Sequence, residues 1–250
     1  DGTTANEPAF SFTAWIKPTN FTNRFTIINK RGNTIAEYIF YIQNDSKMHF
    51  DVFDGAFNTY IGQESDDAIS AGSWIHVAGT YDASRAASGV KLYVNGALID
   101  STAETGGSYT AMENTAENVA MGRLLAGATD NVSLGQINEV AAFDKALSAT
   151  EVAEIYNSGR TLNLNNSSVS ADIVSWWRMG DKATGTPPNY TIPDQVGSNN
   201  ATMASFQGTA TSGLVFDAPN SDAVVAGAAR NQHCLWWNQP ETIECHQHSS

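Results

Sequence analysis

Short segments in which apolar and polar residues alternate recur along most of the chain. In residues 10–17 every second side chain is apolar and falls on one face of an extended strand, Trp15 falls on the other face, and Pro18 ends the segment. Further segments of this kind are residues 25–30, 37–43, 47–53, 60–61, 74–81, 90–94, 97–100, 119–122, 135–143, 173–179 and 213–216. Many short strands bounded by Gly, Asn, Asp or Ser are typical of a β-sandwich, so we predict an all-β fold.

Two turns predict hairpins between neighbouring segments. The Asn-Asp-Ser turn at residues 44–46 separates two of the strands, and Asn95-Gly96 lies between two others. Asn-Gly is the strongest short-range hairpin signal, because both residues tolerate the positive φ that a two-residue turn requires.

One segment has helical rather than strand periodicity. Ser148 and Glu151 form the sequence pattern of a capping box, in which each side chain bonds the backbone N–H of the other. Apolar residues then recur at helical spacing from Val152 to Tyr156, and Gly159 is placed to end the helix in the left-handed conformation. We predict a single helix of about three turns.

The chain is acidic and poor in charge. Of its 250 residues 16% are charged, and 26 Asp and Glu stand against 13 Lys and Arg, which gives a formal net charge of −13. Phosphate binding needs clustered Lys and Arg, so nucleic acid is excluded as a partner and an anionic membrane surface is disfavoured. No run approaches the ~18 consecutive apolar residues of a membrane span, so we expect no membrane insertion.

The hydrophobic content, 42% of the chain, is enough for one large sandwich core or two small ones. We predict that residues 1–216 form this domain. From residue 217 onward Ala, Asn and Ser dominate, and we predict that residues 217–250 are a linker or docking tail, because so short a piece rarely holds a core of its own. Trp236 and Trp237 in this tail would suit an anchor into a neighbouring subunit.

The two cysteines, Cys234 and Cys245, lie close together in the tail. They can form one disulfide that closes a short loop, or remain free thiols. Zinc is a third possibility, because His233, His246 and His248 are nearby, although the spacing matches no finger pattern.

Several segments resemble the successive strands of laminin-G-like, concanavalin A-like modules. They are residues 12–17, 74–78, 90–96 and 135–140, and the predicted helix at residues 147–159 follows the last of them, as it does in that family. The resemblance implies a two-sheet antiparallel jelly-roll sandwich with one short α-helix. It also implies a glycan-binding or adhesive role without catalysis, as is usual for such modules.

The C-terminal segments 176–181, 194–202 and 213–217 resemble pieces that usually precede the first strand of these modules. Here they follow the helix. Either the strand order is rearranged and the domain closes within the chain, or this stretch begins a following module. Residues 175–181 are also similar to laminin-G-like modules of marine bacteriophage structural proteins.

Calcium is the cofactor that the resemblance implies. The family often holds a structural Ca²⁺ between a loop like residues 194–200 and the strand that contains Asn138. Asp194, Asn199 and Asn200 offer the oxygen ligands that calcium prefers, whereas Asn138 stands where the family usually has Asp, which removes one charge. The alternative is a simple turn, because Asp, Asn and Gly favour turns for local reasons.

A sugar site needs an exposed aromatic ring beside amide and carboxylate groups. Two loops offer these residues: Asp54, Phe57, Asn58 and Tyr60 in the first, and Tyr109 in the second. We expect the tryptophans Trp15, Trp74 and Trp176 to be buried instead.

A glycoside hydrolase of this architecture would need two carboxylates about 5–9 Å apart. The nearest approach to the acidic strand motif of such enzymes is residues 64–67, Glu-Ser-Asp-Asp, which lack the third acid and which we place in a turn-rich stretch. The sequence has no nucleophile elbow, zinc-protease motif or phosphate loop, so we expect no enzyme.

The expected function is therefore a non-enzymatic adhesion or recognition module, supported by calcium. It would lie on a virion or another extracellular surface, bind a glycan or a protein, and contact other subunits of a larger assembly. A purely structural cementing subunit without sugar binding is the main alternative, and a glycoside hydrolase is the least supported one.

Overall fold

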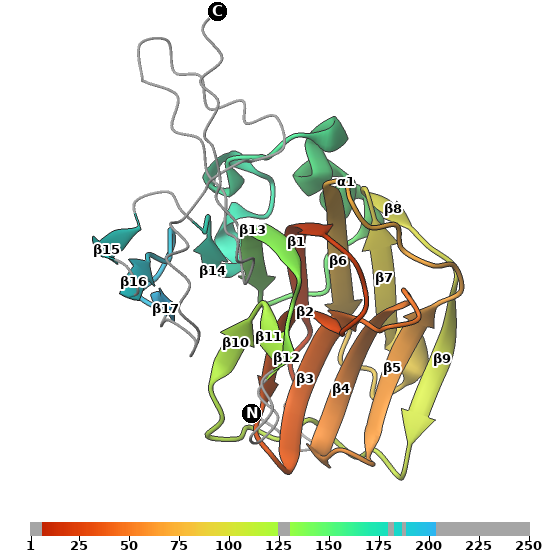
Figure 1. The fold of residues 1–250 in the computed structure, drawn as a ribbon. Helices are drawn as coiled ribbons and strands as arrows, with labels where there is room; N and C mark the ends of the chain where they lie inside the picture. Colours follow the sequence, from red (N-terminus) through yellow and green to blue (C-terminus); the bar gives the residue numbers. More distant parts are fainter. Residues whose placement is uncertain (1–6, 125–130, 180–182, 187–188, 204–250) are drawn as a thin grey trace, which may run out of the picture.

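The computed structural model describes residues 7–124, 131–179, 183–186 and 189–203. Two six-stranded antiparallel sheets are stacked face to face (Figure 1). The first sheet has the order β14 (Ile173–Trp177), β13 (Gly135–Phe143), β1 (Phe10–Pro18), β6 (Ile75–Tyr81), β7 (Val90–Val94), β8 (Ala97–Leu98). The second has the order β10 (Val119–Met121), β2 (Phe25–Arg31), β3 (Ile35–Ile42), β4 (Met48–Ala56), β5 (Tyr60–Ser65), β9 (Ser101–Gly106). The predicted jelly-roll sandwich is confirmed.

The core lies between the two sheets and follows from the alternation in the sequence. Ala14 and Ile16 of β1 are fully buried there, facing Phe40 of β3 and Phe50 of β4. Each large apolar side chain buried in this way contributes about 1.5–3 kcal/mol to stability. Trp15 points to the opposite face, as predicted, and is buried as well.

The predicted helix is confirmed as α1 (Ala149–Tyr156), and its capping box is present. It packs on the outer face of the first sheet, where its apolar side chains join a second buried cluster with Trp176. The helix ends earlier than predicted, because Asn157 (φ 49°) already adopts the left-handed cap conformation that we assigned to Gly159.

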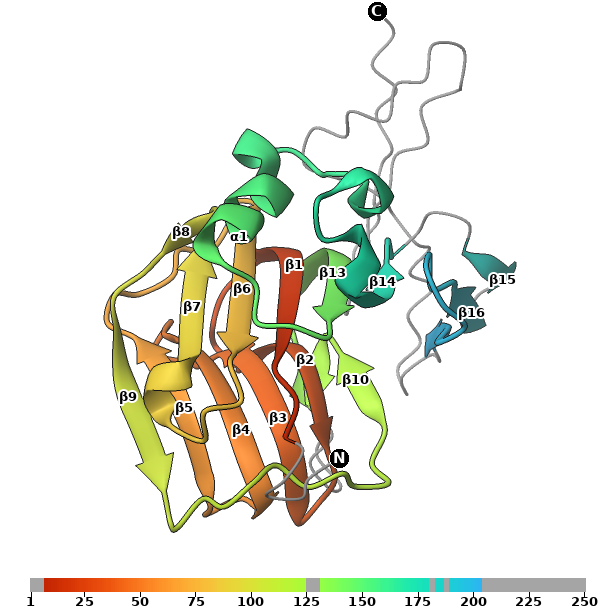
Figure 2. The ribbon, with the colours of Figure 1, turned by 180° about the vertical axis from the view of Figure 1, so that it is seen from behind.

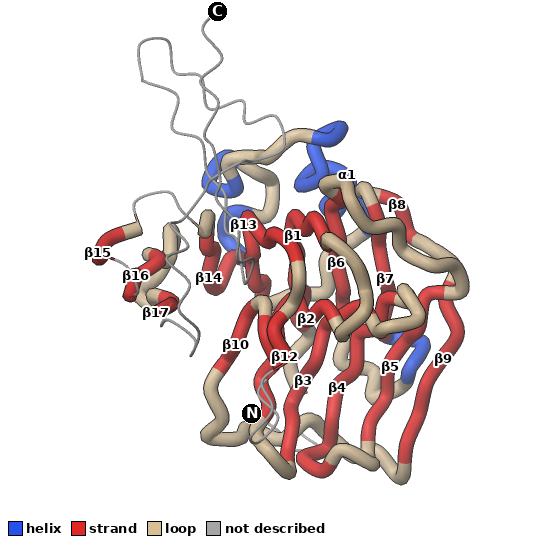
Figure 3. Tube along the Cα trace, viewed as in Figure 1, coloured by secondary structure: helices blue, strands red, loops and turns tan. Residues whose placement is uncertain are grey.

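Short 3₁₀ helices account for most of the remaining helical structure. They are η1 (Ala87–Gly89), η2 (Asn157–Gly159), η3 (Leu164–Asn166) and η4 (Ser170–Asp172). The helical segments that follow β13 lie together at one end of the sandwich (Figure 3). In the part of the chain that the structure describes, no helix has the length and apolar character to span a bilayer.

The first sheet is completed by a segment from beyond the helix. β14 pairs with β13, with Val140 opposite Trp177, and a bridge joins Trp177 to Asp194. At this edge a segment that follows the helix therefore pairs within the same chain. The predicted strand 213–216, the boundary at residue 216 and the tail 217–250 lie outside the described residues.

Several strands differ from the prediction. The predicted strand 97–100 ends at Leu98, and the unpredicted β9 crosses to the second sheet. β9 is an edge strand with many exposed positions, so it lacks the apolar alternation that identifies a buried strand. Also unpredicted are β11 (Arg123–Leu124) and β12 (Asn131–Val132), which form a two-stranded sheet, and β15 (Thr184–Thr186), β16 (Asn189–Ile192) and β17 (Ala201–Met203), which form a three-stranded one.

β5 is longer than predicted. It runs to Ser65, so Glu64 lies in a strand and not in the turn-rich stretch where we placed it. Asp66 and Asp67 lie in the bend that follows.

At the far end of the sandwich from the helices, residues 107–118 connect β9 to β10 (Figure 2).

Candidate functional site

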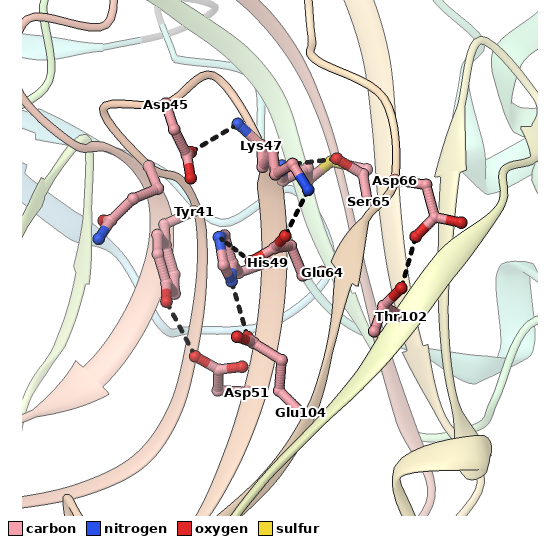
Figure 4. Close-up of polar contacts among 12 residues, drawn as sticks. Tyr41, Asp45, Lys47, His49, Asp51, Glu64, Ser65, Asp66, Thr102 and Glu104 are labelled. Carbon is pink, nitrogen blue, oxygen red and sulfur yellow. Dashed lines mark hydrogen bonds and ion pairs between the residues drawn. The ribbon is translucent and has the colours of Figure 1, made fainter.

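The outer face of the second sheet carries aromatic and charged side chains in cross-strand rows. Phe40 and Phe50 point into the core, so their alternating neighbours on β3 and β4 point away from the first sheet. One row joins Tyr41, His49, Glu64 and Thr102, which lie opposite one another in turn on β3, β4, β5 and β9. The next row joins Ile39, Asp51, Gly62 and Glu104, and a third joins Phe53, Tyr60 and Gly106. Figure 4 shows how the polar members converge.

Tyr41 and His49 form the centre of this face. Their rings are stacked, with centroids 4.7 Å apart and planes 2° from parallel. The guanidinium of Arg24 lies 4.1 Å from the centroid of the Tyr41 ring. Direct cross-strand pairing places the two rings in contact, and the cation adds an attraction to the π face.

Asp51 lies in the next row and is buried, with 4% of its surface exposed. Its Oδ2 accepts a hydrogen bond from the Tyr41 hydroxyl at 3.0 Å, whereas Oδ1 has no partner among the described residues. Burial, together with the charge of Glu104, raises the pKa of Asp51 to about 8. Gly62, directly opposite, makes room for this carboxyl, because a Cβ there would lie 2.2 Å from Oδ1 of Asp51.

Charged groups surround the histidine. Nδ1 of His49 lies 2.9 Å from Oε2 of Glu104, and Nε2 lies 3.7 Å from Oε2 of Glu64. Lys47 pairs with the other oxygen of Glu64 at 2.6 Å. The side chains of Glu64 and Glu104 are partly exposed, by 23% and 29%, so a ligand can approach them on this face.

Aromatic side chains gather at one end of the face. Phe53 is buried, and Phe57 and Tyr60 pack against it half-exposed, with ring centroids 6.1 Å and 5.5 Å from that of Phe53. The guanidinium of Arg31 lies 4.1 Å from the centroid of Phe57. Burial raises the pKa of Tyr60, and the charges of Glu104 and Asp51 act in the same direction. Aromatic surface beside carboxylates can bind the apolar and hydroxyl faces of a sugar ring.

The residues predicted for sugar binding lie at separate places in the structure. Phe57 and Tyr60 lie on this face, and Asn58 is exposed in the turn between them. Oδ2 of Asp54 accepts a hydrogen bond from the backbone N–H of Thr110 at 2.8 Å. Tyr109 does not lie on this face, because it packs against the core between the two sheets.

The Tyr109 hydroxyl donates to the carboxylate of Glu7, which also accepts from Tyr81. The second predicted loop thus serves to hold the N-terminal segment, and its tyrosine is not part of the aromatic face.

The loop predicted to bind calcium forms a tight turn around Asp194. Oδ1 of Asp194 accepts from the backbone N–H groups of Trp176 at 3.0 Å and Val196 at 3.1 Å, and Oδ2 accepts from that of Asn199 at 3.2 Å. The Asn200 amide oxygen accepts from the backbone N–H of Asp194. Burial would raise the pKa of the Asp194 carboxyl, but these backbone donors hold it below its usual value.

Asn138 lies on β13, and its side-chain oxygen accepts from the N–H of Glu139 at 2.8 Å. The adjacent Glu139 is buried and accepts from Trp176 Nε1 at 2.7 Å and from Arg178 Nε at 3.2 Å. Three members of the predicted set thus share one turn, and calcium there remains a prediction. The predicted disulfide and zinc ligands of residues 233–248 lie outside the described residues.

The predicted sugar site omitted His49, Asp51, Glu64 and Glu104. The turn at residues 44–46 sets the register of the first hairpin, so it already places His49 opposite Tyr41. Alternation along β4 then puts Asp51 on the same face. Glu104 could not be assigned, because β9 carries no apolar pattern.

The two stacked antiparallel sheets define a concanavalin A-like β-sandwich. The chain belongs to the concanavalin A-like lectin/glucanase superfamily, whose laminin-G-type family model matches residues 1–153. No curated protein matches the sequence.

Solved structures share the fold at low identity. A protein from Bacteroides ovatus, provisionally named a carbohydrate-binding protein, is 16% identical with a TM-score of 0.56; the match covers 81% of this chain and 54% of that one. This chain therefore spans about half the length of that protein. A pentraxin from Limulus polyphemus (17% identity, TM-score 0.43, 82% and 88% coverage) and a sialidase CBM40 module from Ruminococcus gnavus with bound α2,3-sialyllactose (16%, 0.45, 60% and 83%) are also similar.

Proposed function

We propose that this protein is a non-enzymatic carbohydrate-recognition module that binds its ligand on the outer face of the second sheet. The observation that carries the proposal is the juxtaposition of half-exposed aromatic rings, Phe57 and Tyr60, with the partly exposed carboxylates of Glu64 and Glu104. Aromatic rings cover the C–H face of a sugar, and carboxylates accept hydrogen bonds from its hydroxyl groups. The name given to the Bacteroides ovatus protein agrees with this class of ligand.

Binding is favoured over hydrolysis by the state of the carboxyl groups. A glycosidase needs an acid and a second carboxylate that both reach the scissile bond. Asp51 has the raised pKa of an acid, but it is 4% exposed and held by the Tyr41 hydroxyl, so a substrate does not reach it. The accessible groups on this face are therefore suited to holding a sugar.

The setting that we propose is an extracellular surface, either of a virion or of a cell. The virion is inferred from residues 175–181, which we expect to resemble modules of marine bacteriophage structural proteins. The net charge of −13 suits a ligand without phosphate groups. In this setting the module would join other subunits of a larger assembly. Calcium at the Asp194 turn would support the fold and would not contact the sugar.

A glycan array probed with the full chain, followed by calorimetry with the best ligand, tests the proposal. We expect Tyr60→Ala to weaken binding by at least about tenfold, because it removes the ring that stacks on the sugar. Tyr190→Ala is the matched control: Tyr190 is a half-buried tyrosine of β16, in the small three-stranded sheet, and its loss should leave the affinity unchanged.

Two results would overturn the proposal. One is an array on which the folded protein binds no glycan, which would favour the cementing role. The other is an affinity that Tyr60→Ala and Tyr190→Ala leave equally intact, which would place the sugar on another surface.

A further inference from the structure

His49 has one ring nitrogen without a partner, although the residue is 5% exposed. Its Nδ1 lies 2.9 Å from Oε2 of Glu104, and an ionised carboxylate can only accept, so Nδ1 carries the proton. In the neutral imidazole Nε2 is then the nitrogen with the free lone pair, and it is buried with no hydrogen-bond partner among the described residues. A buried polar atom without a hydrogen-bond partner is energetically unfavourable, so Nε2 is available to a ligand.

Carboxylates of two other elements lie near the His49 ring. Asp45 lies in the turn between β3 and β4, and Glu64 lies on β5 directly opposite His49. One ligand atom from each of the three side chains lies within 4.8 Å of the other two (Figure 4). We propose that His49, Glu64 and Asp45 form a binding site for a divalent transition metal of the zinc type.

The distances agree with this proposal. Two ligand atoms that each lie about 2.0–2.1 Å from one tetrahedral ion are about 3.4 Å from each other. Nε2 of His49 and Oε2 of Glu64 are 3.7 Å apart, which is too long for a hydrogen bond but close to the span of two ligands of one metal.

Two further contacts orient the side chains of His49 and Asp45. Glu104 fixes the ring of His49 through Nδ1, as a carboxylate commonly does for a metal-bound histidine, and is therefore a positioning residue. Oδ1 of Asp45 accepts from the backbone N–H of Lys47 at 3.0 Å, which leaves Oδ2 for the ion. Asp45 is exposed, so the metal and a water ligand can enter from solvent.

The ligand set selects the kind of metal. An imidazole nitrogen with two carboxylates is a zinc-type set, whereas calcium takes six to eight oxygen ligands. The proposed site is thus distinct in position and in chemistry from the calcium predicted at Asp194. The Lys47 ammonium, 2.6 Å from Oε1 of Glu64, is an internal competitor for the same carboxylate.

The test is a calorimetric titration of chelator-treated full chain with Zn²⁺ alone. The tail holds other soft ligands, so the background variant carries His→Gln at 233, 246 and 248 and Cys→Ser at 234 and 245. We expect this background to bind one Zn²⁺. Within it, His49→Gln and Glu64→Gln should each weaken binding by more than about tenfold, and Glu104→Gln by about 10–100-fold.

Lys47→Met provides a variant expected to gain affinity, because it removes the competing cation. Glu113→Gln, an exposed carboxylate of the β9–β10 connection, is the control that should leave binding unchanged. Nitrogen-15 spectra of the His49 ring should show a proton on Nδ1, and a shift of Nε2 when zinc is added. This signature also tests the site if a His49 variant fails to fold.

The inference does not rest on the proposed function, because the probe is the metal and no glycan is present. It is overturned if the background variant binds no zinc, or if His49→Gln and Glu64→Gln bind zinc as tightly as Glu113→Gln. It is also overturned if Ca²⁺ displaces Zn²⁺ at equal concentration, or if the Nε2 resonance does not move.

Discussion

Glu104 and His49 form a polar contact of 2.9 Å although they lie on strands that are not neighbours. Strand β5 separates β9 from β4, and its residue directly opposite Glu104 is Gly62, which has no side chain on this face. The acidic edge strand thus reaches the stacked pair of Tyr41 and His49 from across β5.

Gly62→Ala should destabilise the protein by about 1–3 kcal/mol, because the added Cβ would lie 2.2 Å from Oδ1 of Asp51 and 2.8 Å from the carbonyl oxygen of Phe50. Urea unfolding measures this cost. Gly72→Ala is the contrast: no atom lies within 4 Å of its added Cβ, and only its positive φ of 91° adds a cost of about 1 kcal/mol. Equal stability of Gly62→Ala and the parent would contradict the crowding at Gly62.

His76 makes the fold sensitive to acid. Burial lowers the pKa of His76 to about 3, and neither ring nitrogen has a hydrogen-bond partner among the described residues. The unfolded chain takes up the proton near the ordinary pKa of about 6.5, so stability falls as the pH decreases from about 6.5 toward about 3, by up to about 1.4 kcal/mol per pH unit.

Replacing His76 by Phe should remove this part of the pH dependence, because the site already packs aromatic rings of Trp15 and Tyr156. Free energies of unfolding between pH 4 and 7 check it. Identical slopes for the parent and His76→Phe would show that His76 does not titrate in this way.

Glu139 joins β13 to β14 through side chains. Glu139→Ala should cost roughly 1–3 kcal/mol, because it leaves Nε1 of Trp176 buried without an acceptor. Glu139→Gln keeps an acceptor and should cost less. In a double-mutant cycle with Trp176→Phe, the two substitutions should be non-additive, and strict additivity would contradict a direct bond.

We expect calcium bound at the Asp194 turn to raise the temperature of thermal unfolding. A ligand that binds only the folded state adds RT ln(1 + [L]/Kd), about 2.7 kcal/mol at a hundredfold excess over Kd. Unfolding in excess calcium should therefore occur at a higher temperature than in excess chelator, and Asp194→Asn should abolish the difference. An unfolding temperature of the parent chain that is the same in calcium and in chelator would show that calcium does not bind the folded protein.

The strands that face the core were predictable from alternation, and the helix from its capping box, because both patterns are local. The edge strand β9 was not, since a half-exposed strand needs no apolar period. The candidate site includes a residue of that strand. Phe57 and Tyr60 were predicted from the sequence as loop aromatics. Glu104 lies near them because β9 pairs with β5, and that pairing was not predicted. Tyr109, which we predicted in the second sugar-binding loop, lies away from this face and contacts Glu7, a residue far from it in the sequence.

The central claim is that a sugar binds on the outer face of β4, β5 and β9. The crystal structure of the protein with the best glycan from the array tests it most directly. We expect a sugar ring stacked on Tyr60, with its hydroxyl groups donating hydrogen bonds to Glu104 or Glu64. A glycan bound at the loops around Asp194, or on the first sheet, would contradict it.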